Sequence, residues 1–164
     1  MNSMLSDASA LAKVERCATL VAGAALVAMA ATEAWQVFAR YVMNASPGWT
    51  EPVALFLLAT AMSLGAGACV RSWSHFAFFV LADNAPRALR SALQGFASLV
   101  VAAIGAALAV WGTQLLIDGI EVPAAGAPMP QSAVFLPIAI GGALMCVFAI
   151  ERLVVRRAVP AAEH

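Results

Sequence analysis

The sequence predicts an all-α membrane protein with four transmembrane helices and both termini in the cytoplasm. Of its 164 residues, 63% are apolar and 11% are charged, whereas soluble domains average roughly 45–50% and 25%. A soluble domain of this size could not bury so much apolar surface. About 20 apolar residues cross a bilayer, and four stretches carrying one charge or none are long enough to do so: 17–39, 53–70, 91–117 and 122–150.

We expect one integral membrane domain over residues 1–164, with spans at about 17–39, 52–70, 89–117 and 133–155. Each span is predicted to be helical because irregular backbone cannot face lipid. The first span also has features of a secretory signal, since Lys13 and Arg16 precede it, but its apolar character continues past Glu33. The third is long for a single crossing, so it should tilt or project beyond the bilayer.

Two connections differ in character. Residues 118–132 contain Pro123, Pro128 and Pro130, which predicts an irregular outer loop. Residues 72–86 are aromatic and too few to cross, so we expect a helix lying in the cytoplasmic interface. A loop buried against the other helices is the alternative for this segment.

The basic residues predict the orientation. With the N-terminus in the cytoplasm, eight of the nine lysines and arginines lie on the cytoplasmic side and only Arg40 lies outside. Cytoplasmic loops are enriched in such residues. Four crossings then place both termini in the cytoplasm.

Several kinds of site are not indicated. The cysteines Cys17, Cys69 and Cys146 lie in apolar stretches with no C-x-x-C pair, and the histidines are His75 and His164. This pattern does not predict a zinc site, a disulfide framework or a bis-histidine haem. The phosphate-binding glycine motifs are also absent from the sequence. We therefore expect no enzyme activity, no metal and no cofactor.

Glu33 is the one ionisable residue well inside an apolar stretch. An intramembrane carboxylate is costly and is a functional candidate. At about 1.5 Å per residue it lies near the outer boundary rather than the midplane, with Gln36 and Arg40 on much the same face. Proton or ion coupling is one interpretation, and a structural or contact role is the other.

Small residues recur on one face of the third span, which would let another helix approach closely. That face serves either packing within the chain or contact with another protein, and it consists of Ser98, Ala102, Gly105, Ala109 and Gly112. At the start of the second span, Thr50-Glu51-Pro52 suits a helix N-terminus. Trp49 suits the aromatic belt of a membrane interface.

Taken in order, several motifs resemble the small membrane subunit (DctQ-like) of tripartite ATP-independent periplasmic transporters, the TRAP family. The stretch from Arg40 to Glu51 is similar to the family's R-x-x-x-N-x-S-x-x-W-x-E. The residues that carry the likeness, and that we take as candidate subunit contacts, are Arg40, Asn44, Trp49, Glu51, Gly65, Arg71 and His75. Phe79 departs from the family pattern, in which an acidic residue is usual there, and so does Pro52.

The resemblance implies a transporter subunit in the bacterial inner membrane. In that family a soluble periplasmic solute-binding protein delivers an organic acid, a large multi-pass permease subunit holds the substrate and sodium sites, and the small subunit braces it. The chain has few polar groups with which to line a path of its own, in agreement with this role.

Two other functions are compatible with four membrane-spanning helices. A stand-alone four-helix, proton-coupled small-molecule exporter would use Glu33 as its coupling carboxylate, yet Glu33 lies near the outer boundary. The membrane anchor of a respiratory complex would need paired intramembrane histidines.

Overall fold

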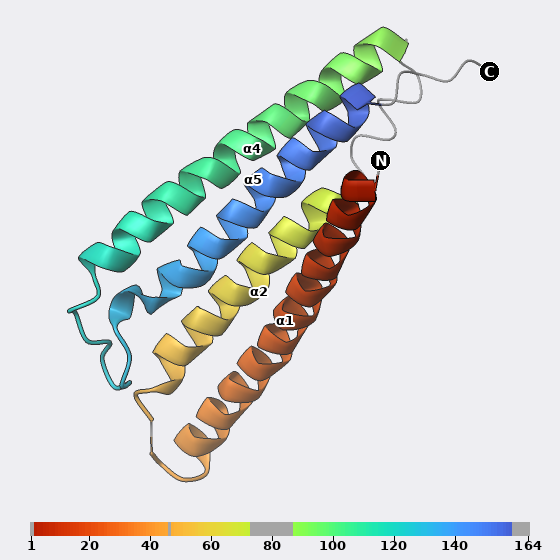
Figure 1. The fold of residues 1–164 in the computed structure, drawn as a ribbon. Coiled ribbons are helices and arrows are strands. Elements are labelled where there is room, and N and C mark those ends of the chain that lie inside the picture. Colours follow the sequence, from red (N-terminus) through yellow and green to blue (C-terminus); the bar gives the residue numbers. More distant parts are fainter. Residues whose placement is uncertain (1, 46, 73–86, 159–164) are drawn as a thin grey trace.

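The computed structural model describes residues 2–45, 47–72 and 87–158, and it is helical over most of them (Figure 1). Its helices are α1 (Asn2–Tyr41), α2 (Thr50–Ser72), α4 (Arg87–Asp118), the short 3₁₀ helix η1 (Gln131–Val134) and α5 (Phe135–Ala158). Four helical stretches are long and apolar enough to cross a membrane: Ala10–Tyr41, Thr50–Arg71, Ala92–Asp118 and Gln131–Val154. The predicted four helices are therefore confirmed. The interfacial helix expected over 72–86 lies outside the described residues except for Ser72, which is the last residue of α2.

The helices stand in a single row rather than around a common axis. Figure 1 shows the order α1, α2, α5, α4, and neighbours in that order contact one another. Along the length of the helices, the start of α1 and the end of α5 lie at the same end, which we call the terminal end. The connections between α1 and α2 and between α4 and α5 lie at the other, the loop end.

α5 occupies an inner place because two consecutive glycines let a helix approach on each side. A Cβ on Gly141 would lie 2.6 Å from Ser63 of α2, and one on Gly142 would lie 2.7 Å from backbone atoms of α4. The Ser63 hydroxyl also donates a hydrogen bond to the carbonyl oxygen of Pro137, 2.8 Å away. Side chains at these two positions would force the row apart.

α1 begins far earlier than the apolar stretch predicts. The helix starts at Asn2, whereas the predicted span starts at residue 17. Two contacts hold the later part of this extension: Leu11 packs against the apolar cluster of Val70, Phe148 and Ala149, and Glu15 forms an ion pair with Arg71. At about 1.5 Å per residue, α1 is longer than a bilayer's hydrocarbon layer is thick.

The loop end is closed by contact between the two connections. Asn44 adopts a φ of 51° just after α1, a left-handed conformation that asparagine tolerates better than most residues. In the other connection Gly126 has a φ of +81°, and a Cβ there would lie 2.6 Å from the carbonyl carbon of Gly48. The irregular loop predicted over 118–132 is thus held backbone to backbone against the first connection.

Candidate functional site

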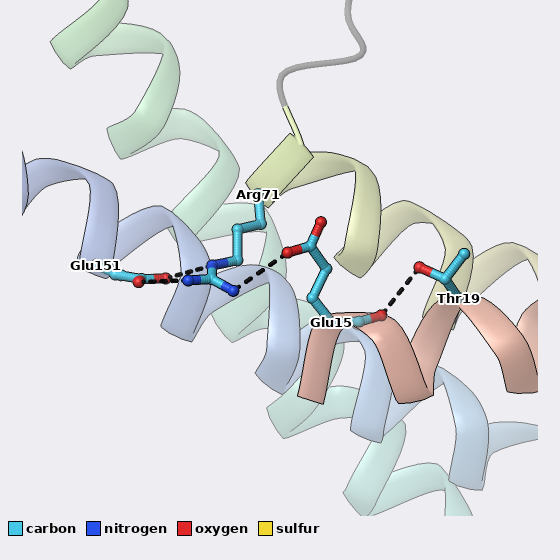
Figure 2. A network of polar contacts seen from close by, with 4 residues as sticks. All are labelled: Glu15, Thr19, Arg71 and Glu151. Atoms are coloured by element: carbon cyan, nitrogen blue, oxygen red, sulfur yellow. Dashed lines mark hydrogen bonds and ion pairs between the residues drawn. The ribbon is translucent and has the colours of Figure 1, made fainter. Parts of the chain in front are cut away.

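The strongest cluster of charges among the described residues joins three helices at the terminal end (Figure 2). Arg71 of α2 donates from Nε and Nη2 to the two carboxylate oxygens of Glu151 on α5, over 3.1 and 3.2 Å. Its Nη1 donates to Oε2 of Glu15 on α1, 3.2 Å away. One guanidinium therefore connects α1, α2 and α5.

The Arg71 cluster is partly shielded from solvent. The side chains of Arg71, Glu15 and Glu151 are 18%, 27% and 15% exposed. The Arg71 guanidinium also lies over the ring of Phe148, 5.8 Å from its centroid, which favours the cation. Nearby, Arg152 donates to the carbonyl oxygen of Val70 at 2.6 Å and so meets the last turn of α2.

This geometry suits anchoring rather than chemistry. A bidentate arginine–carboxylate pair holds its partners in fixed orientation, and the second carboxylate extends the contact to the edge helix α1. Across the described ranges, no three histidine, cysteine, aspartate or glutamate side chains are grouped so that they could hold a metal ion.

The predicted motif residues do not form one site. Arg71 lies at the terminal end, whereas Arg40, Asn44, Trp49 and Glu51 lie at the loop end, in or beside the connection between α1 and α2. His75 lies outside the described residues. Gly65 faces α1, since a Cβ there would lie 3.9 Å from that of Ala22.

At the loop end Trp35 and Trp49 border an open apolar hollow of about 470 Å³. Both tryptophans are nearly half exposed, at 46% and 40%. Arg40 and Glu51 are exposed as well. Half-exposed tryptophans are typical of a membrane interface, which agrees with the aromatic belt expected at Trp49.

The small-residue face of α4 lies against α5. Ala102 packs against the Phe148 cluster, and Cβ atoms on Gly105 and Gly112 would lie 2.7 and 3.2 Å from α5 backbone. Ala109 meets Gly142 of α5, and the Ser98 hydroxyl donates to the carbonyl oxygen of Gln94 within α4. Of the two interpretations of this face, its contacts with α5 therefore favour packing within the chain over contact with another protein.

Glu33 lies on the exposed surface of α1. In the part of the chain that the structure describes, the Glu33 carboxylate has neither a hydrogen bond nor an ion pair. The Arg40 guanidinium also has neither within those residues. The sequence placed both residues on one face of the helix, but it did not indicate which side of the molecule that face is on.

Glu15 and Glu151 are the residues that the sequence analysis missed. The orientation of the chain depends only on its lysines and arginines, so the acidic residues beside them do not enter that prediction. In each case the sequence shows an acidic residue next to basic ones: Glu15 lies between Lys13 and Arg16, and Glu151 directly precedes Arg152.

Residues 29–158 match the family model of tripartite ATP-independent periplasmic transporters, DctQ component. The chain belongs to this family. A comparison with curated proteins gave no match. Membership confirms the resemblance argued from the motifs, and it makes the chain a TRAP-transporter small subunit, a transporter component rather than a member of an enzyme family. The Arg71 cluster lies partly outside the matched region, because Glu15 precedes it.

Proposed function

We propose that this TRAP small subunit braces a large multi-pass permease subunit in the bacterial inner membrane. In the proposal, the assembly uses a sodium gradient to take up an organic acid that a periplasmic solute-binding protein delivers. Both termini are cytoplasmic, so the Arg71 cluster lies at the cytoplasmic boundary and the loop end lies at the periplasmic boundary.

Family membership carries this proposal, and the arrangement of the helices supports it. A row has two broad faces but encloses no interior between its helices. The most apolar stretches of the spans are only 11–33% buried within the chain. Several polar side chains of the described spans, among them Ser63, Thr60 and Ser98, donate hydrogen bonds to backbone carbonyl groups of the same chain. Such a surface is open to lipid and to another membrane protein alike, and family membership favours the latter.

Reconstitution tests the proposal. Proteoliposomes would hold this chain and the large subunit, with the binding protein outside and a labelled carboxylic acid that it retains in equilibrium dialysis. We expect uptake under an inward sodium gradient only when all three proteins are present. Proton-driven transport by this chain alone would favour the exporter interpretation instead.

A further inference from the structure

The exposed face of α1 around Glu33 carries the inference. We call it the Glu33 face and define it as Leu26, Ala30, Glu33, Val37 and Arg40, which are all exposed. Their alternating spacing of four and three residues puts them on one side of the helix. Such spacing is typical of helices that pack side by side at a shallow angle.

The face is apolar apart from two opposite charges. Leu26 and Val37 are 53% and 55% exposed. Glu33 and Arg40 lie two turns apart, and neither has an ion-pair or hydrogen-bond partner within the described residues. In membrane proteins, ionisable residues within a span almost always face protein or water rather than lipid.

Glu33 lies inside the first span, toward its outer end. It lies about 12 Å from the end of α1 at Tyr41, at 1.5 Å per residue. Side chains on a helix lean toward its N-terminus, which for α1 is the terminal end. The Cα–Cβ bond of Glu33 therefore tilts toward the middle of the span, away from the loop end.

A second observation concerns Gly23, which lies about one helical turn before Leu26 in α1. A Cβ there would meet nothing within 4 Å, as at Gly95 of α4, whereas Gly105, Gly112, Gly141 and Gly142 all abut a neighbouring helix. A glycine in an exposed helix costs stability and gains no contact in return. Gly23 leaves room for a neighbour that this chain does not supply.

We infer that the Glu33 face docks a transmembrane helix of the large permease subunit, one with a hydrogen-bond donor or cation opposite Glu33 and an acceptor opposite Arg40. The inference rests on the proposed function and adds to it which helix face makes the contact. α1 is an edge of the row, so this face is open to a neighbour.

The charges argue against other occupants. In a symmetric pair of this chain the two-fold axis would lie along the membrane normal, so Glu33 would face Glu33 and Arg40 would face Arg40. Both contacts would be repulsive. A phospholipid headgroup would suit Arg40, but its chains would leave the Glu33 carboxylate without a donor.

Photo-crosslinking tests the face directly, with adjacent alanines as a matched pair. Ala30 and Ala31 are both exposed, yet they point about 100° apart. Each would be replaced by p-benzoylphenylalanine in the full complex, co-expressed with the large subunit. We expect at least fivefold more crosslink to the large subunit from position 30 than from position 31.

Equal yields, a stronger product from position 31, or a product joining two copies of this chain would overturn the inference. A wild-type chain that fails to co-purify with the large subunit would contradict the proposed function itself. Correct assembly with crosslinks on the wrong face would contradict only the inference.

Substitution of Glu33 gives an independent readout. Glu33→Leu removes the costly carboxylate, so the variant should insert at least as well as the wild type. We nevertheless expect about tenfold less large subunit to co-purify with it. Glu33→Gln keeps an amide that can accept the partner's hydrogen bond and should retain at least half of the complex. Normal co-purification with Glu33→Leu would overturn the inference.

Discussion

Arg71 shows how one side chain can fix the relative positions of three helices. Its guanidinium presents donors in a rigid plane, and two of them meet the carboxylate of Glu151 while a third meets Glu15. Glu151 is the more buried partner, at 15% exposed against 27% for Glu15. Burial and bidentate geometry should make the Glu151 contact the stronger of the two.

A double-mutant cycle measures that difference. With Arg71→Met, Glu151→Gln and Glu15→Gln, we expect a coupling free energy of about 1–2 kcal/mol for Arg71 with Glu151 and below about 1 kcal/mol for Arg71 with Glu15. The measurement is unfolding in mixed detergent micelles, followed by tryptophan fluorescence. A larger coupling to Glu15 would contradict this ranking of the two ion pairs.

Glu33 also separates the bracing role from the exporter role. An exporter's coupling carboxylate must gain and lose a proton in every cycle, so Glu33→Gln would abolish transport. In a bracing subunit the charge only accepts hydrogen bonds or pairs with a cation, and its loss should cost about 1–3 kcal/mol at most.

We therefore expect Glu33→Gln to leave substantial sodium-driven uptake in proteoliposomes that contain the large subunit, with the binding protein outside. The initial rate of solute uptake is the quantity to measure. A rate at background, from a complex that still assembles, would give Glu33 a role in the mechanism.

Among the helices, α5 is the one whose packing depends most on glycines, which carry no side chain at its contacts with α2 and α4. Gly141 and Gly142 bring α2 and α4 to within contact of its backbone, and Phe148 and Ala149, further along, are fully buried. α4 contributes the matching small surface at Gly105. Close approach of backbones is a main source of affinity between helices in lipid, where the hydrophobic effect does not drive them together.

Two glycines of α4 provide a matched test of this packing. A Cβ on Gly105 would lie 2.7 Å from backbone atoms of α5, whereas one on Gly95 would meet nothing within 4 Å. We expect Gly105→Leu to lower the free energy of unfolding by about 3 kcal/mol and Gly95→Leu to leave it unchanged or raise it by up to about 1 kcal/mol.

The same micelle unfolding assay compares these two variants. Gly105→Leu, like Gly112→Leu, should also reduce co-purification with the large subunit and uptake, in this case because α4 separates from α5. Equal stability of the Gly105→Leu and Gly95→Leu variants would show that close helix contact does not hold α4 in the row.

At the scale of the whole molecule, the row has a terminal end rich in charge and a loop end of tryptophans, prolines and glycines. The basic residues of the sequence predict that the terminal end faces the cytoplasm. The parity of four membrane-spanning helices requires both termini to share a side.

Reporter fusions test this orientation. We expect a green-fluorescent-protein fusion at His164 to fluoresce and an alkaline-phosphatase fusion there to be inactive, because the phosphatase is active only in the periplasm. A phosphatase inserted in the loop between Pro123 and Pro130 should be active. Phosphatase activity from the His164 fusion would reverse the predicted orientation.

The number and approximate bounds of the membrane-spanning helices followed from the sequence, because the bilayer's thickness sets a minimum apolar length that is local in the chain. The family followed from the order and spacing of motifs such as Arg40 to Glu51. The start of α1 did not, since residues 2–16 are too polar to signal a span and the contact of Leu11 is made with distant parts of the chain.

Only the tertiary structure decided how the helices lie relative to one another. Gly105 and Gly112 form a small-residue face whether they meet α5 or another protein, and nothing local distinguishes the two cases. The partners of Arg71 are likewise remote in the chain, with Glu15 and Glu151 on two other helices. By itself the sequence determined which segments enter the membrane, because that depends on each segment's own transfer free energy. Which faces meet depends on the pairing of distant surfaces, and so it was decided by the fold.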